Sequence, residues 1–207
     1  MGPLSLMSSD LPPPPPVAPV VPLESALVER ARRGDGAAFR EIFRQHGPRV
    51  WRFLRDLVGP SAADEATQET FVRAHASLTG GAPVERLAPW LFGVARNVAR
   101  EHRRASARTV PLPDPVDDEA PAPSPDPEAL LAGRQADAAL ARALEGIADD
   151  RRAALLLRVD HDLAYGDIAA ALNWPIARVK NEIHRARLQL RAALAHHLDA
   201  TEARHGR

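Results

Sequence analysis

Residues 163–190, with the sequence LAYGDIAAALNWPIARVKNEIHRARLQL, decide the fold of this end of the chain. Their apolar periodicity predicts a short helix over residues 165–172, then a turn, then a longer helix. Asn173 tolerates the left-handed backbone conformation that ends a helix, and Pro175 suits the first turn of the next one. Two helices joined by so tight a turn are typical of a helix-turn-helix.

The longer helix divides into an apolar face and a basic face. Val179, Ile183, Ala186 and Leu190 follow one another at spacings of four, three and four residues, which places them on one side. Side chains near the start of such a helix can reach base edges in the major groove, and later arginines can reach phosphates. A surface helix with a solvated basic face is the alternative. The candidate DNA-binding residues are Arg178, Lys180, Asn181, His184, Arg185 and Arg187.

Proline marks two segments outside the helical domains. Residues 1–23 contain a run of five prolines, which predicts an extended, disordered tail. Residues 109–129 combine alternate prolines with acidic side chains and no basic one, which predicts a stiff acidic linker. The pattern therefore predicts an all-α fold of two small helical domains, at residues 24–108 and 130–200, with a short tail at residues 201–207.

Glycine and proline clusters divide the first domain into helices. Breaks are expected at residues 34–36, 59–60 and 80–83, where these residues gather. Ser61 is expected to cap the helix after the second break, because a serine oxygen can accept from the first free N–H groups. The helix after the third break is expected over residues 84–107.

That last helix carries a basic stripe opposite an apolar side. Arginines recur from Arg96 at i, i+4, i+7 and i+8, a pattern that can follow a phosphate backbone. Asn97 lies beside the stripe and can hydrogen-bond an exposed base. A helix with an ordinary charged outer face is the alternative. The candidate residues are Trp90, Arg96, Asn97, Arg100, Arg103 and Arg104.

The preceding helix carries an acidic, amide-rich strip. It consists of Asp64, Glu65, Gln68 and Glu69, with Phe71 and Val72 expected to turn elsewhere. Such a strip suits a basic protein surface. The alternative is that acidic groups near a helix start only stabilise the helix dipole.

Composition gives no support to several other classes of protein. The 207 residues include no cysteine, so neither a disulfide framework nor a thiolate zinc site is possible. The eight histidines lack metal-ligand spacing, and no nucleophile motif accompanies His161. No apolar run approaches the length of a membrane span, and no signal peptide is recognisable. We therefore expect a cytoplasmic protein that is not an enzyme and has no cofactor or metal.

Three segments occur in a familiar order. Residues 64–74 read DEATQETFVRA, residues 89–99 read PWLFGVARNVA, and several short matches follow between residues 155 and 187. The first is similar to a polymerase-binding segment, the second to a promoter-melting helix, and the third to a C-terminal helix-turn-helix. Together they resemble the extracytoplasmic-function (ECF) group of RNA polymerase sigma factors, within the sigma-70 family.

The resemblance implies a role for each candidate set. The acidic strip would bind the clamp helices of the largest subunit of core RNA polymerase, and the Trp90 helix would hold the melted minus-10 element with one flipped base. The helix after Pro175 would read the minus-35 element as duplex, and the linker would thread the polymerase cleft. An anti-sigma factor is a further implied partner.

Two departures from the family pattern bear on specificity. Asn173 replaces a usual glycine before the recognition helix, and Glu182 replaces a usual basic residue within it. The promoter sequence therefore cannot be transferred from relatives. The alternative function is a helix-turn-helix transcriptional regulator without sigma activity, which would use the second domain alone.

Overall fold

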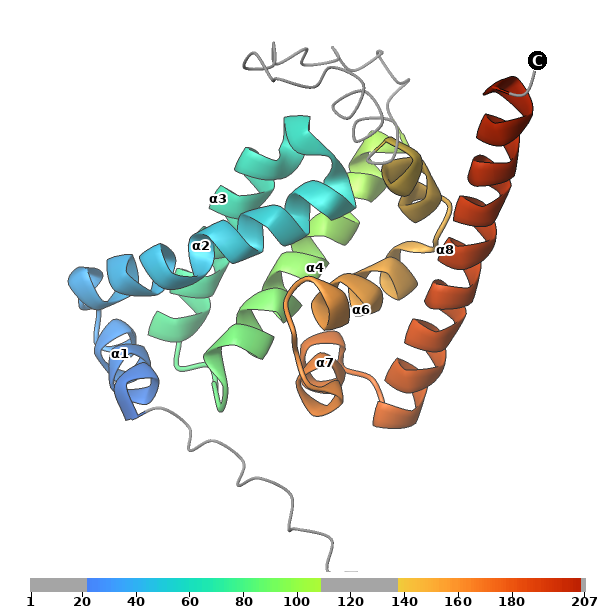
Figure 1. Cartoon of the computed structure of the whole chain (residues 1–207). Coiled ribbons are helices and arrows are strands. Elements are labelled where there is room, and N and C mark those ends of the chain that lie inside the picture. The colour runs from blue at the N-terminus through green and yellow to red at the C-terminus, as the bar shows by residue number, and fades with distance from the viewer. Residues whose placement is uncertain (1–21, 109–137, 206–207) are drawn as a thin grey trace, which may run out of the picture.

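The computed structural model describes residues 22–108 and 138–205, and within these ranges every regular element is a helix. The all-α prediction is therefore confirmed. The expected N-terminal tail and linker lie largely outside the described residues, whereas α8 continues to His205, into the segment expected to be a C-terminal tail. Residues 138–145 are helical at the start of the second range. The other helices are α1 (Pro22–Arg32), α2 (Gly36–Val58), α3 (Pro60–Thr79), α4 (Leu87–Ser106), α6 (Asp149–Val159), α7 (Tyr165–Leu172) and α8 (Ile176–His205), shown in Figure 1.

The expected breaks in the first domain fall where the glycines allow a change of direction. Asp35 caps α2, and its Oδ1 accepts hydrogen bonds from the N–H groups of Ala37 at 2.9 Å and Ala38 at 3.2 Å. The helix ends at Gly59, whose φ of 89° is favourable only for glycine. The prediction that Ser61 caps α3 is wrong, because α3 already begins at Pro60. Proline has a helical φ and lacks the N–H that a cap would satisfy.

The start of α4 also differs from the prediction. The helix begins at Leu87 rather than at residue 84, and Arg86 before it is extended. The reason is Pro89, which is tolerated in the first turn of a helix that starts at Leu87. In a helix that started at residue 84, Pro89 would lack an intrahelical hydrogen bond, and its ring would meet the carbonyl of Glu85.

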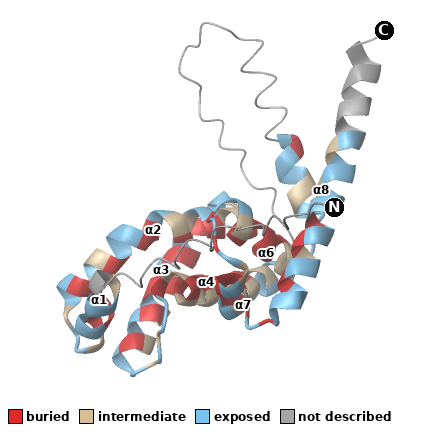
Figure 2. Ribbon diagram, turned by 60° about the horizontal axis from the view of Figure 1, so that its bottom comes forward, coloured by how far each residue is buried: buried red, intermediate tan, exposed pale blue. Residues whose placement is uncertain are grey.

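The first domain packs α1, α3 and α4 around the long helix α2. Phe53 and Leu54 of α2, Leu78 of α3 and Leu91 of α4 are almost completely buried where these helices meet. Phe53 and Phe92 meet edge to face, with ring centroids 5.2 Å apart. Figure 2 shows this buried core continuing into the second domain at α6 and α7.

The second domain contains the predicted helix-turn-helix. Helix α7 has the predicted bounds, and Asn173 at its end adopts the left-handed conformation, with φ 53° and ψ 50°. Val179, Ile183 and Ala186 of α8 are buried against the rest of the domain. The apolar spacing therefore predicted the inward face of α8 correctly.

The two domains pack directly against each other. The buried ring of His161, between α6 and α7, lies against Phe53 and Phe92 of the first domain, with centroids 5.8 and 4.7 Å away. Gly93 of α4 lies so close to α7 that a Cβ atom there would be 2.9 Å from the carbonyl oxygen of Ala171. Packing at this distance depends on the absence of a side chain at Gly93.

Candidate functional site

The basic face of α8 is open to solvent. All six candidate residues, Arg178, Lys180, Asn181, His184, Arg185 and Arg187, are exposed. The guanidinium of Arg178 lies 4.1 Å from the centroid of the Trp174 ring, a cation–π contact that orients it at the start of the helix. Exposed amide, imidazole and cationic groups along the first turns of one helix can contact bases and phosphates.

Glu182 interrupts this face without leaving a free negative charge. Its carboxylate accepts a hydrogen bond from Nε of Arg151 at 2.6 Å and lies 3.5 Å from Arg185. Arg151 belongs to α6, so Glu182 links α8 to α6. The family's basic residue is thus replaced here by an intramolecular ion pair.

The basic stripe of α4 is divided between solvent and the second domain. Asn97 and Arg104 are exposed, and Arg100 is half-buried. Arg96, whose side chain is only 11% exposed, pairs with Asp150 at 2.7 Å, and Arg103 pairs with Asp149 at 2.8 Å. In this arrangement two carboxylates at the start of α6 neutralise two arginines of the α4 stripe.

Trp90 does not belong to the exposed part of the stripe. It is half-buried and packs against the core, as the predicted apolar side of α4 requires.

The interdomain contact also involves the segment before α4, where Arg86 pairs with Asp167 of α7. Arg152, almost fully buried, donates to the carbonyl of Leu57 at 3.1 Å.

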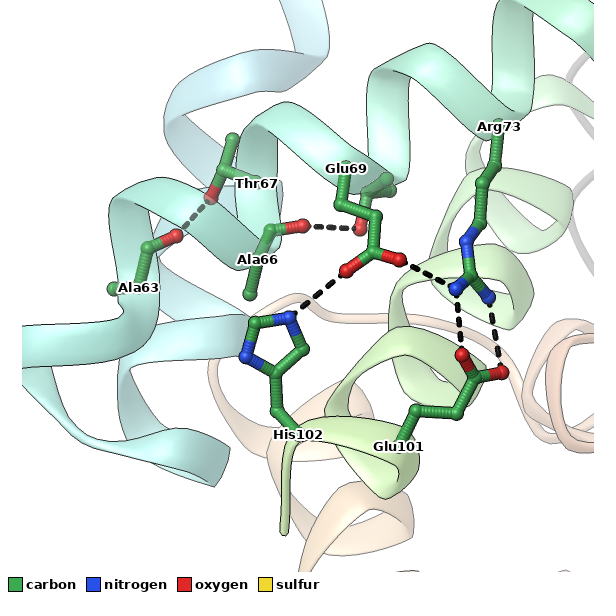
Figure 3. A network of polar contacts seen from close by, with 8 residues as sticks. Ala63, Ala66, Thr67, Glu69, Arg73, Glu101 and His102 are labelled. Carbon is green, nitrogen blue, oxygen red and sulfur yellow. Dashed lines mark hydrogen bonds and ion pairs between the residues drawn. The ribbon is translucent and has the colours of Figure 1, made fainter. Parts of the chain in front are cut away.

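The acidic strip of α3 divides in the same way. Glu65 and Gln68 are exposed, and Asp64 is exposed but accepts a hydrogen bond from Nε1 of Trp51 at 2.7 Å. Glu69 instead turns towards α4, where it contacts His102 at 2.9 Å and pairs with Arg73 (Figure 3). Glu69 is thus part of an intramolecular network rather than of the open strip.

This network links α3 to α4 through charge. Arg73 also pairs with Glu101 of α4, at 2.5 Å in its shorter contact. The hydrogen bond from His102 and the neighbouring Arg73 hold the pKa of Glu69 below its usual value, and Arg73 likewise lowers the pKa of Glu101. Both carboxylates stay ionised at neutral pH, so the network adds charged contacts between α3 and α4.

An apolar groove between α2 and α3 was not predicted from the sequence. Phe39, Phe43 and Phe71 form edge-to-face pairs along it, and its volume is about 620 Å³. Val72 was expected to turn away from the acidic strip, but it is 61% exposed and lines the groove together with Gln68. The recurrence of Phe39, Phe43 and Gly47 at every fourth residue is the one signal in the sequence, and it also fits an ordinary core face.

Other kinds of site find little support in the described ranges. Residues 22–108 and 138–205 hold no group of three or more side chains placed to bind a metal ion. His161 is buried, and neither of its ring nitrogens has a hydrogen-bond partner. Burial, together with Arg49 and Arg52, lowers its pKa to about 4, so it is neutral at pH 7.

None of the helices that the structure describes is both long and apolar enough to span a membrane.

Comparisons with known proteins match both halves of the chain. Residues 42–109 match the family model of sigma-70 region 2, and residues 137–190 match that of sigma-70 region 4. The ECF RNA polymerase sigma factor SigE of Mycolicibacterium smegmatis is 35% identical over 81% of this chain and 67% of its own length. The RNA polymerase sigma-H factor of Pseudomonas aeruginosa is 28% identical over 83% of this chain and 93% of its own.

Solved structures share the fold. CnrH, solved in complex with the cytosolic domain of CnrY, superposes with a TM-score of 0.64 at 23% identity, over 84% of this chain and 97% of that one. The sigma factor RpoE of Bartonella quintana, solved with the anti-sigma factor NepR, gives a TM-score of 0.59 at 23% identity, over 76% and 96%.

The helix-turn-helix, the stripe of α4 and the strip of α3 thus occur together in a chain whose two halves match two successive regions of one family. The similarity to SigE extends across both halves, which a protein that shared only a helix-turn-helix would not show. The chain belongs to the ECF group of RNA polymerase sigma factors, which direct promoter-specific initiation of transcription.

Proposed function

We propose that the two domains divide the work of initiation between them. The domain at residues 24–108 binds core RNA polymerase and holds the minus-10 element, and the domain at residues 130–200 reads the minus-35 element. The observation that carries this division is the separation of the three candidate surfaces. The α3 strip with its groove, the α4 stripe and the α8 face lie on different helices, so one chain can contact polymerase and both promoter elements.

For polymerase binding, we propose that the α3 strip acts together with the apolar groove. Asp64 and Gln68 belong to both, so charge and apolar surface are continuous there. Exposed Phe43 and Val72 offer apolar area that a partner helix can bury, and Glu65 offers a charge for a basic partner. Glu69 contributes indirectly in this proposal, because its network links α3 to α4.

For promoter opening, Asn97, Arg100 and Arg104 are available as the domains stand. Arg96 and Arg103 become available to phosphates once they leave Asp150 and Asp149, which requires α6 to move away from α4. Contacts to the unstacked base and the backbone then offset the few kcal/mol that base extraction costs. The half-buried ring of Trp90 supports the helix that carries these groups.

For the minus-35 element, α8 would lie in the major groove of duplex DNA. Asn181 and His184 suit base edges, and Arg178, Lys180, Arg185 and Arg187 suit phosphates and guanine edges. The proposed linker between the domains keeps the role that the resemblance implies, passage through the polymerase cleft. The chain acts in the cytoplasm, without catalysis of its own.

An anti-sigma factor completes the proposed set of partners. The support comes from the neighbours in fold, since RpoE was solved with the anti-sigma factor NepR and CnrH with the cytosolic domain of CnrY. A regulator that uses the helix-turn-helix alone is not favoured, because it leaves the match of residues 42–109 without a role.

The polymerase surface can be tested at Val72. Replacing it with serine in the full chain removes apolar area that docking would bury, which is worth roughly 1 kcal/mol, and should weaken binding to core polymerase. Leu188→Ser on α8 is the matched control, because Leu188 is 52% exposed and lies outside the groove. Equal affinities of both variants for core polymerase, measured by fluorescence anisotropy, would remove the groove from the proposal.

A further inference from the structure

The groove between α2 and α3 is unlike an ordinary surface of a folded domain. Phe43 is 48% exposed and Val72 is 61% exposed, and both face the same hollow as Trp51 and Phe71. Among the residues that the structure describes, Asp64 and His75 are the only titratable side chains that line it. An apolar, aromatic surface of this kind normally has an occupant.

The groove has the form that accepts a polyproline segment. Phe43 and Phe71 meet edge to face with centroids 4.7 Å apart, and Phe39 meets His75 in the same way at 4.8 Å. These rings give the groove an aromatic lining, and proline-rich segments dock in aromatic-lined grooves at a small entropic cost, since they are already extended. Proline also lacks an N–H group, so it leaves no buried donor without a partner.

The chain itself contains such a segment. Residues 11–16 read LPPPPP, and the only charged side chain among residues 1–21 is Asp10. Five prolines at about 3.1 Å each span about 16 Å. The groove follows α2 from Phe39 to Trp51, and this stretch of helix is about 18 Å long at 1.5 Å per residue. Segment and groove match in length as well as in chemistry.

The segment can also reach the groove. Glu24, two residues after the start of α1, lies 3.5 Å from His46 of α2, and the next residue of α2, Gly47, lines the groove. Five residues lie between Pro16 and Pro22, and the six steps from one proline to the other can extend over about 19 Å. A path halfway around a helix about 10–12 Å across is about 16–19 Å long, which this span just covers.

We propose that the proline run of residues 11–16 docks in the α2–α3 groove of its own chain and competes there with core polymerase. The docking rests on the groove, and the competition rests on the proposed polymerase surface. A tether this short gives the segment an effective concentration in the millimolar range, so it favours the run over a second copy of the chain. Polymerase binding must displace the run, which weakens the apparent affinity by the fraction of chains in which the groove is free.

The docking is tested by photo-crosslinking in the full chain. Phe43 is replaced by p-benzoylphenylalanine, which keeps an aromatic ring in the groove, and the same group at Leu188 is the control. After irradiation of an equal mixture of isotope-labelled and unlabelled protein, we expect adducts from position 43 to residues 11–17 within one chain. Adducts no more frequent than from position 188, or formed only between chains, would overturn the docking.

The competition has separate readouts. Pro13→Gly with Pro15→Gly should reduce the intramolecular adduct and tighten binding to core polymerase by about 3- to 10-fold, because a groove occupied in roughly 70–90% of chains becomes free. Added polymerase should reduce the adduct in the unaltered run. Adducts that persist when polymerase is bound would leave the docking intact and remove both the competition and the polymerase surface. Polymerase binding without any tail adduct would overturn the docking and leave the proposed polymerase surface intact.

Discussion

The close approach of Gly93 to Ala171 allows us to predict how a substitution changes the docking of the two domains. In Gly93→Ala, the new Cβ atom would lie 2.9 Å from a backbone carbonyl oxygen that has no freedom to rotate away. Overpacking of this kind costs about 1–3 kcal/mol. The equilibrium between docked and separated domains should therefore shift about 5- to 150-fold towards separation.

The same substitution should stabilise the first domain locally. Alanine is favoured over glycine inside a helix by about 1 kcal/mol, and Gly93 lies within α4. Loss of docking together with an unchanged or more stable first domain is thus the expected signature. Since Arg96 would leave Asp150 as the domains separate, binding to single-stranded minus-10 DNA should also become tighter.

The assay is the distance between spin labels on cysteines introduced at the exposed positions Ala76 and Ala192, in a chain with no other cysteine. Gly166→Ala is the matched control, because Gly166 lies in α7 with no atom within 4 Å of its new Cβ. The parent and control should give one narrow distance distribution, and Gly93→Ala a broader, longer one. A narrow, unchanged distribution for Gly93→Ala would refute the reasoning.

The remaining predictions concern pH and DNA. Docking lowers the pKa of His161 from 6.5 to about 4, so the separated state binds the proton first as the pH falls. The contribution of His161 to the free energy of docking is therefore fully present above pH 6.5, and roughly 2–3 kcal/mol of it is lost as the pH falls towards 4. His161→Leu should remove most of this dependence in the spin-label assay, and an unchanged profile would exclude His161 as its cause. Asn97→Ala should reduce promoter opening, measured by permanganate reactivity, several-fold more than it reduces polymerase binding, whereas equal losses would contradict its assigned role. Lys180→Ala should weaken minus-35 binding and lower the salt slope by about one unit, and an unchanged slope would rule out a phosphate contact.

Local rules were enough to predict the helices and the helix-turn-helix. The αL residue Asn173 and the apolar spacing of α8 depend only on near neighbours, so the sequence carries that information directly. The break that ends at Pro83 predicts a start of α4 three residues before the observed one at Leu87, because Pro89 also limits where the helix can begin. At Ser61, the preference of serine for caps gave way to the fixed φ of Pro60.

The sequence indicates which residues belong to the candidate surfaces, but not which residues of other helices they contact. Arg96, Arg103 and Glu69 were assigned to open surfaces, yet each has an intramolecular partner supplied by a different helix. Residues 54 positions apart, such as Arg96 and Asp150, meet only through tertiary packing, which no local pattern encodes. The groove is not evident from the sequence for the same reason, since Phe43 has the spacing of a core residue and is exposed because none of the described helices covers it.

The most direct test of the account is transcription in vitro from sheared DNA of the source organism, with core RNA polymerase in the presence and absence of this chain. With a sigma factor of this kind we expect new transcripts with defined starts that share upstream sequence elements, and their loss when the α8 basic face is neutralised by Lys180→Ala with Arg185→Ala. No new starts, together with no binding to core polymerase, would contradict the central claim.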